Sequence, residues 1–253
     1  MRIQGISGSR GVAVGNVYRY IQEEIVIPDY TVADDKVEEE IGKFAAAMAA
    51  TLKQLDTIRQ KALDEMGAEE AAIFEAHMQI AQDPSLSDGI KSLVESSHTN
   101  VVAATAQTIE TFANIFLGME DPYMRERGAD IKDIGDRLMR NMLGMNPRGL
   151  SHISGEVILV AQDLAPSDTA SLDKNVVKGI VTAAGGPTSH AAIMARTLEI
   201  PAVMGVGDIE SFVDGDKAVV LGTDGIVEMN PSDADWDEYT NQAAAFQEEL
   251  KRL

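Results

Sequence analysis

The spacing of hydrophobic residues divides the chain into a helical middle and two flanking β-rich parts. From residue 37 to residue 58, apolar side chains recur at steps of three and four, which places them on one face of a helix. The same spacing recurs over residues 69–80, 86–95, 101–116 and 123–142. Because the connections between these segments are short, neighbouring helices are expected to run antiparallel. The middle of the chain therefore predicts a helical bundle or a pair of helical hairpins.

The parts on either side of the bundle have the pattern of β-strands. Residues 1–20 alternate in polarity and carry four glycines, as in one or two strands with tight turns. Beyond residue 146 the chain predicts short strands, one helix and a closing β-hairpin, over residues 157–160, 177–183, 190–199, 202–206, 217–221 and 226–229. The opening segment is too small to fold alone, so we expect it to complete this second α/β part.

These elements predict an α+β fold built around a discontinuous α/β domain. Residues 1–22 and 146–231 are expected to form that domain, and residues 23–145 a helical subdomain inserted into it. Residues 232–253 form a charged helical tail, which we interpret as a linker to a further domain. An open-ended tail of this kind favours a fragment of a longer protein over a short natural one.

Charge and composition narrow the class of protein. The chain has 41 acidic and 21 basic residues, a net charge of −20, which argues against binding to nucleic acid. The excess of acidic residues either keeps the protein soluble or forms an acidic face that attracts a basic partner. The absence of cysteine excludes disulfides and cysteine-type zinc sites. We find neither a signal peptide nor an apolar run near the roughly 20 residues of a membrane helix, so a cytoplasmic protein without membrane association is expected.

The segment GGPTSHAAIMAR carries the candidate chemistry. A strand is expected to end just before Gly185 and Gly186, and a helix to begin near Ser189. Thr188 or Ser189 suits the N-cap, because its hydroxyl can accept a backbone N–H of the first turn. His190 then lies at a helix N-terminus, where N–H groups and the helix dipole favour an anion. The two glycines let the backbone approach a phosphate closely.

An imidazole at this position can carry a phosphoryl group. A neutral imidazole is a competent nucleophile near pH 7, since its unperturbed pKa is about 6.5. Geometry and electrostatics supply most of what phosphoryl transfer needs from a protein. The other ring nitrogen needs a partner to fix the tautomer, for which the Thr169 hydroxyl or a backbone carbonyl could serve. The alternative is that His190 is an ordinary structural residue at a helix start, but the length of the motif favours a phosphate site.

The remaining histidines indicate no second site. His77, on a bundle helix, is either an exposed partner contact or a helix residue satisfied by its neighbours. His98 and His152 lie in polar loop sequence. Four scattered histidines without paired spacing predict no metal site. No nucleophile elbow or catalytic triad order points to hydrolysis.

Several segments together resemble a known family. GGPTSHAAIMARTLEIPAVMG is similar to the phosphohistidine signature of the phosphoenolpyruvate-utilising enzymes. GISGSRGVAVG, AAIFEAHMQIAQDP, YMRERGADIKDIGDRLMRN and EVILVAQDLAPSDTASL narrow the resemblance to the N-terminal half of enzyme I of the bacterial phosphotransferase system. The matches cover the chain to about residue 231. The signature alone would also fit pyruvate phosphate dikinase and phosphoenolpyruvate synthase.

The resemblance implies a fold, an activity and a set of site residues. The fold would be a swivelling α/β phosphohistidine domain with an inserted helical subdomain that docks the carrier protein HPr. The activity would be transfer of a phosphoryl group on Nε2 of His190 to HPr, with Thr169 bonded to the imidazole and the glycine turn cradling phosphate. The positions that match the docking surface are Glu69, Glu75, His77, Ile80, Asp83 and Arg127.

The chain departs from the family pattern at a few positions and in length. Ala68, Glu70 and Pro84 stand where relatives carry charged residues, and Pro187 where an arginine is frequent. The chain has roughly half the family's length. The absent half would hold the site for phosphoenolpyruvate and Mg, a cysteine proton donor and the main dimer contacts. We therefore expect no cofactor here, a monomer for the isolated domain and a homodimer for the full-length enzyme.

Two other functions stay open at this point. The chain could be a carrier-binding module without turnover, which the intact signature disfavours. It could also be the phosphohistidine domain of a dikinase-type enzyme, in which the helical insertion has another role. The sequence does not separate a sugar-uptake pathway from a nitrogen-type regulatory branch.

Overall fold

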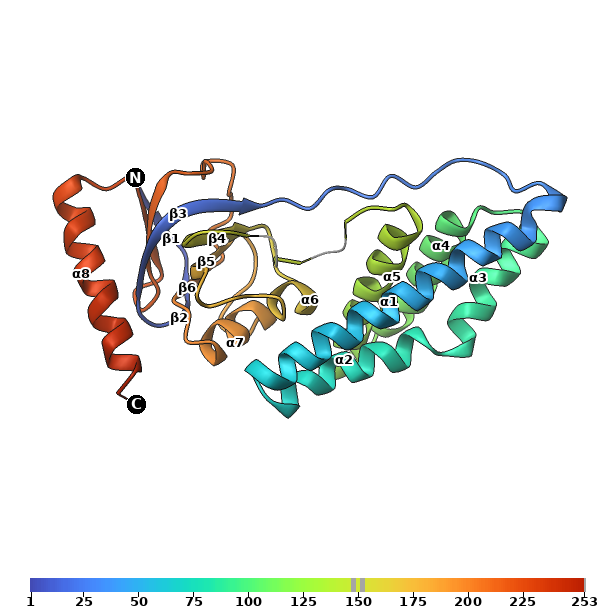
Figure 1. The fold of residues 1–253 in the computed structure, drawn as a ribbon, viewed down its shortest axis with the longest axis horizontal. Coiled ribbons are helices and arrows are strands. Elements are labelled where there is room, and N and C mark those ends of the chain that lie inside the picture. Colours follow the sequence, from blue (N-terminus) through green and yellow to red (C-terminus); the bar gives the residue numbers. More distant parts are fainter. Residues whose placement is uncertain (147–148, 151–152, 253) are drawn as a thin grey trace. The chain divides into compact units, whose positions relative to one another are not determined.

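The chain folds into two compact units. The computed structural model describes residues 1–146, 149–150 and 153–252, so His152 lies outside the described residues. One unit comprises Met1–Gln22 and Gly149–Leu253, and the other comprises Glu23–Arg148 (Figure 1). The first unit contains a mixed sheet and the second is helical, which agrees with the α+β fold predicted from the sequence.

Over residues 23–146, the helical unit has five α-helices at the predicted positions, preceded by a short 3-10 turn at Asp34–Lys36. They are α1 (Val37–Glu65), α2 (Ala68–Ala81), α3 (Pro84–Ser97), α4 (Val101–Leu117) and α5 (Pro122–Met142). The starts of α3, α4 and α5 are capped by side chains of Asp83, Asn100 and Asp121, which accept backbone N–H groups of the first turn. Local sequence therefore determines where these helices begin.

An apolar core holds the helices of this unit together. Ile90, Val94, Ile134 and Leu138 are each 0% exposed and belong to one cluster. Gly135 allows α5 to approach α4 closely, because a Cβ at that position would lie 2.6 Å from Ile109. The apolar faces expected from the sequence are thus the faces that pack.

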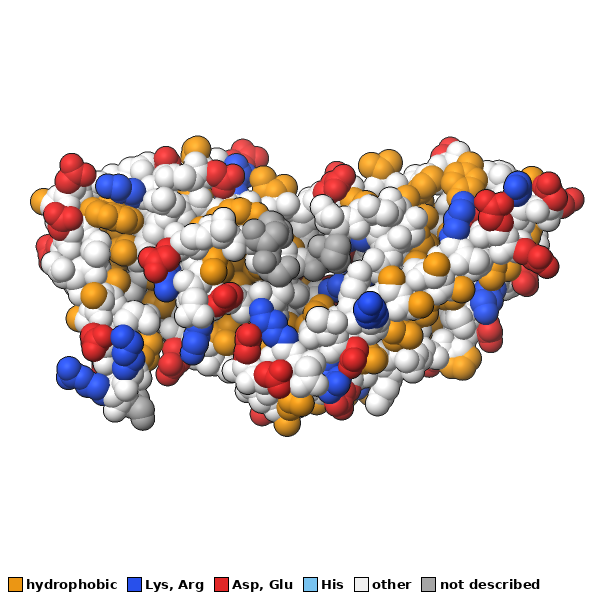
Figure 2. All heavy atoms as spheres, viewed as in Figure 1, with side chains coloured by type: hydrophobic (Ala, Val, Ile, Leu, Met, Phe, Trp, Pro, Cys, Tyr) orange, Lys and Arg blue, Asp and Glu red, His pale blue; other side chains and the backbone are white. Residues whose placement is uncertain are grey.

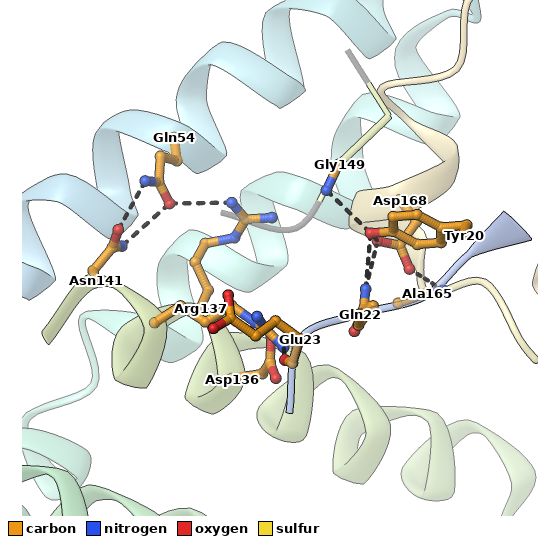
Figure 3. Close-up of polar contacts among 11 residues, drawn as sticks. Tyr20, Gln22, Glu23, Gln54, Asp136, Arg137, Asn141, Gly149, Ala165 and Asp168 are labelled. Carbon is orange, nitrogen blue, oxygen red and sulfur yellow. Dashed lines mark hydrogen bonds and ion pairs between the residues drawn. The ribbon is translucent and has the colours of Figure 1, made fainter. Parts of the chain in front are cut away.

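A polar seam joins α5 to α1 beside that core. Arg137 Nη1 donates to Gln54 Oε1 at 3.1 Å, and Gln54 Nε2 donates to Asn141 Oδ1 at 2.9 Å (Figure 3). Asn141 Nδ2 donates in turn to Thr51 Oγ1 at 2.9 Å. Since buried polar groups need partners, these bonds fix the register between the two helices.

An eight-stranded sheet forms the centre of the α/β unit, with the order β1-β8-β7-β3-β4-β5-β6-β2. The strands are β1 (Arg2–Gln4), β2 (Ile6–Ser9), β3 (Val12–Tyr20), β4 (Val157–Ala161), β5 (Val177–Thr182), β6 (Ala202–Met204), β7 (Lys217–Leu221) and β8 (Ile226–Met229). Strand β3 pairs with β4 in parallel and with β7 antiparallel. The opening segment therefore completes the sheet, as predicted, although it supplies three strands instead of one or two.

In the described part of this unit, three helices accompany the sheet. They are α6 (Pro166–Thr169), α7 (His190–Thr197) and α8 (Asp233–Leu250). The sequence pattern predicts α7 and α8 but not α6, because a helix of four residues shows no periodicity. Among the described residues, none of the helices has the length and apolar character needed to cross a membrane.

The C-terminal helix α8, interpreted above as a linker, packs against the α/β unit. A Cβ at Gly11 would lie 2.4 Å from the ring of Phe246, so the helix approaches the backbone of the opening segment closely. Tyr239 donates to Glu228 at 2.9 Å, and the ammonium of Lys217 lies 5.0 Å from the Trp236 ring centroid. No residue of α8 is buried, so the contact is shallow.

Candidate functional site

His190 is the first residue of α7 and follows the turn after β5. Ser189 takes the N-cap position, and its Oγ accepts the Ala192 backbone N–H at 3.3 Å. Of the two N-cap candidates in the sequence, Ser189 is thus the one used, and Thr188 lies exposed in the turn. The His190 side chain is neither fully buried nor fully exposed. The imidazole therefore lies at a helix N-terminus with access to solvent, as an anion site requires.

The two glycines of the turn play different parts. Gly185 has φ +91°, a conformation that side-chain-bearing residues rarely adopt, and a Cβ there would lie 3.2 Å from Ser189 Oγ. Gly186 lacks a positive φ, and a Cβ there would meet nothing within 4 Å. The turn therefore requires glycine at position 185. At position 186 a side chain would find open space, so the turn does not require glycine there.

Thr169 lies beside the imidazole, as the family resemblance implied. Its Oγ1 is 3.1 Å from Nε2 of His190, and it donates its own proton to the Pro166 carbonyl at 2.9 Å. A hydroxyl has one proton, so while it donates to the Pro166 carbonyl it can only accept from the imidazole. Nε2 consequently carries the ring proton in this arrangement. The contact involves Nε2 itself, whereas the sequence reasoning expected a partner on the other ring nitrogen.

The residues expected to dock a carrier are distributed over α2, α3 and α5. Glu69 and Glu75 are exposed on α2, and Ile80 is partly exposed near its end. Asp83 is exposed but also serves as the N-cap of α3. Arg127 on α5 lies over the Tyr123 ring, 5.4 Å from its centroid. Five of the six expected residues therefore have accessible side chains.

The expectation that His77 contacts a partner is wrong for this structure. Its side chain is 0% exposed, with Nε2 3.1 Å from Asp130 and Nδ1 3.7 Å from Asp133, both on α5. Phe74 and Ala81 are buried on the same face of α2. Their spacing of three and four residues from His77 was the signal in the sequence that this face points inward.

Several exposed apolar side chains were not identified from the sequence, and one of them, Tyr123, lies against Arg127. Ile115, in the last turn of α4, is 55% exposed, Met119, just after that helix, is 38% exposed, and Tyr123, at the start of α5, is 58% exposed. Ile193, one turn after His190 on α7, is 46% exposed. Large apolar groups left in solvent next to charged ones are typical of protein contact surfaces.

Acidic side chains are abundant on both units. Figure 2 shows Asp and Glu side chains spread over the visible face of each unit, with Lys and Arg interspersed. No group of three or more metal-ligating side chains occurs within the described part of the chain. The surface therefore offers charge for protein contacts but no cluster that predicts a metal site.

Known families and structures match almost the whole chain. The family model described as "PEP-utilising enzyme, N-terminal" matches residues 4–127, and "PEP-utilising enzyme, mobile domain" matches residues 153–225. A solution structure of Enzyme I matches with a TM-score of 0.85 and 39% identity, over 97% of this chain and 99% of its own. The chain belongs to the PEP-utilising enzymes. The mobile-domain match includes His190 and Thr169, and the N-terminal match includes the residues on α2 and Arg127.

Among these PEP-utilising enzymes, curated relatives carry the name phosphoenolpyruvate-protein phosphotransferase. One from Streptococcus equinus is 43% identical over 96% of this chain, and one from Geobacillus stearothermophilus is 41% identical over 97%. The chain spans 42% of the length of either relative. A structure titled as the N-terminal domain of Enzyme 1 – Nitrogen matches with a TM-score of 0.64 and 25% identity, over 94% of this chain and 98% of its own.

Proposed function

We propose that this chain acts as the N-terminal part of a phosphoenolpyruvate-protein phosphotransferase, and that His190 exchanges a phosphoryl group with the carrier HPr. The observation that carries the proposal is the imidazole of His190 at the start of α7, with Thr169 Oγ1 3.1 Å from its Nε2. The names of relatives that cover nearly the whole chain support the same activity. Reaction with phosphoenolpyruvate would need the remaining length of those relatives.

The proposed transfer changes one nitrogen–phosphorus bond for another. The bond from phosphorus to the carrier's imidazole breaks as the bond to Nε2 of His190 forms, so no water or metal is consumed. Nε2 needs a free lone pair to attack, so the ring proton that it donates to Thr169 must first move to Nδ1 by exchange with solvent. The carrier's imidazole then leaves as a neutral ring that keeps its own N–H. A phosphoryl group on Nε2 would occupy the place of that hydrogen bond. Transfer therefore requires the imidazole and the Thr169 hydroxyl to separate, after which the hydroxyl can donate to a phosphoryl oxygen.

The start of α7 supplies the electrostatic part of the proposed site. Backbone N–H groups of a first helical turn and the helix dipole favour a negative group placed beside them. Ser189 closes part of that turn by accepting the Ala192 N–H, so the helix start is ordered before phosphate arrives. Electrostatic stabilisation of this kind is preorganised and needs no change in the backbone.

We propose that HPr docks on the helical unit. The exposed side chains of Glu69, Glu75 and Asp83 provide acidic groups for a basic carrier face. Ile80 and the exposed side chains of Ile115, Met119 and Tyr123 provide apolar area whose burial would stabilise the complex. His77 is not part of the proposed surface, because it is buried.

The rest of the proposal follows from the length of the relatives. We assign the sites for phosphoenolpyruvate and Mg, and the contacts of a homodimer, to the remaining length of those relatives. The present chain by itself would then be a monomer. The helix α8 would lead to that remaining part. A cytoplasmic location is proposed because the relatives' named activity uses soluble phosphate donors and acceptors.

Phosphoryl exchange with labelled phospho-HPr tests the proposal. We expect label on the wild-type chain, none on His190→Ala, and none when phosphoenolpyruvate is the only donor. Label that persists in His190→Ala would refute the assignment. A folded chain that binds HPr but takes no label would instead be a binding module, and one that neither binds HPr nor takes label would fit a dikinase-type domain.

A further inference from the structure

The helix that carries Thr169 is too short to hold its own position. α6 has four residues, and isolated helices shorter than about 12 residues are marginal in water. Its place in the α/β unit therefore depends on contacts with other elements. Those contacts decide whether the Thr169 hydroxyl reaches His190.

Asp168, the residue before Thr169, has both carboxylate oxygens engaged. Oδ2 accepts the Ala165 backbone N–H at 2.9 Å, which closes the turn at its first residue. Oδ1 accepts the Tyr20 hydroxyl at 2.8 Å and Nε2 of Gln22 at 3.3 Å (Figure 3). Asp168 is 0% exposed, so these donors replace water around a buried charge. Removing one of these donors leaves the Asp168 carboxylate poorly solvated, which lowers the stability of the folded arrangement.

Tyr20 connects that carboxylate to the sheet. It is the last residue of β3 and pairs with Ala161 of β4. Its hydroxyl also accepts the Gly149 backbone N–H at 3.2 Å and Nε2 of Gln22 at 2.8 Å. Burial, and then the neighbouring Asp168 carboxylate, raise the pKa of Tyr20 to about 12. Tyr20 therefore keeps its proton near neutral pH and remains a donor to Asp168.

We propose that Tyr20 and Asp168 are positioning residues, which fasten α6 to β3 so that the Thr169 hydroxyl meets Nε2 of His190. The inference rests on the proposed function of His190 and extends it to two residues to which the sequence analysis assigned no role. Tyr20 and Asp168 act through Thr169, and Thr169 acts on the imidazole. The same strand that completes the sheet thus orders the proposed phosphate site.

A matched pair of tyrosine variants tests this role. Tyr20→Phe removes only the hydroxyl that donates to Asp168, whereas Tyr239→Phe removes a tyrosine–carboxylate bond of the same type on α8. The first readout is the nitrogen-15 NMR signal of the His190 imidazole, which reports the ring tautomer. We expect Tyr20→Phe to lower the Nε2–H population and to slow exchange with phospho-HPr roughly fivefold, the effect of one hydrogen bond. Tyr239→Phe is expected to change neither.

A double-mutant cycle separates positioning from a general loss of stability. In the Thr169→Ala background, Tyr20→Phe is expected to cause no further slowing, because its effect passes through the missing hydroxyl. Slowing that adds in full to that of Thr169→Ala would overturn the proposal. An unchanged imidazole signal in folded Tyr20→Phe would overturn it as well.

A second variant and the choice of readouts keep the test decisive. If Tyr20→Phe fails to fold, Asp168→Asn takes its place, since the amide oxygen can still accept from Tyr20 while the NH₂ group cannot accept from Ala165. The same change in His190 is expected, and no change overturns the proposal. If wild type takes no phosphoryl group, the proposed function fails, while the imidazole signal still decides the role of Tyr20.

Discussion

Nε2 of His190 and Oγ1 of Thr169 lie 3.1 Å apart, although 21 residues separate them in the chain. Because Thr169 gives its own proton to the Pro166 carbonyl, the imidazole is the donor in this contact. With that assignment of hydrogen bonds, the nitrogen that we propose as the phosphoryl acceptor carries the ring proton. The hydrogen bond orients the ring, and it must break when phosphorus binds.

Removal of the Thr169 hydroxyl is expected to slow exchange without unfolding the protein. Thr169→Ala should lower the rate of phosphoryl exchange with phospho-HPr roughly fivefold, because the variant lacks the hydroxyl that would donate to a phosphoryl oxygen, a hydrogen bond worth about 1 kcal/mol. Thr169→Ser should restore most of the rate, since it keeps the hydroxyl. Thr197→Ala, on the exposed face of α7, is the control and should have no effect. Equal rates for wild type and Thr169→Ala would remove Thr169 from the site.

The two glycines before α7 are expected to differ when substituted. Gly185→Ala should reduce the free energy of unfolding of the α/β unit by about 1–2 kcal/mol, since its φ of +91° is strained for any other residue. Gly186→Ala should change it by less than about 0.5 kcal/mol, because its surroundings are open and its φ is not positive. Urea unfolding of both variants measures the difference. Similar losses for the two would contradict the assigned roles.

Substitution of His77 is expected to destabilise the helical unit. His77→Ala would leave a cavity and remove the group between Asp130 and Asp133, at a cost of about 3 kcal/mol. Gln79→Ala, on the exposed side of α2, should change stability by less than about 0.5 kcal/mol. Thermal unfolding distinguishes them. If His77→Ala keeps full stability and weakens only HPr binding, the side chain is a surface contact after all.

Association with HPr is expected to weaken as salt increases. Exposed acidic groups attract a basic partner electrostatically. Physiological salt screens this attraction beyond about 8 Å, and more salt shortens that distance further. Glu69→Gln should weaken binding up to about fivefold at low salt, and Glu95→Gln, exposed on α3, should not. Calorimetric titration at several salt concentrations measures both. Binding that is independent of salt would point to the apolar group around Tyr123 as the main contact.

The five bundle helices and the longer strands could be predicted because each is long enough to show its period. The exceptions have physical reasons. α6 is a single turn held by Tyr20 from another part of the chain, so no local pattern reports it. The family resemblance suggested Thr169 as a partner of His190, but only the fold gives the nitrogen that it meets. For His77 the sequence left an exposed partner contact and a satisfied helix residue open, and the spacing of buried residues on α2 decides for burial.

The central claim is that His190 carries phosphate on Nε2, and NMR of the phosphorylated chain tests it most directly. After incubation with phospho-HPr, nitrogen-15 and phosphorus-31 spectra identify the nitrogen bonded to phosphorus. We predict an acid-labile phosphoryl group on Nε2 of His190 and loss of the Nε2–H signal that marks the contact with Thr169. A phosphoryl group on Nδ1, on another residue, or on none would contradict the account.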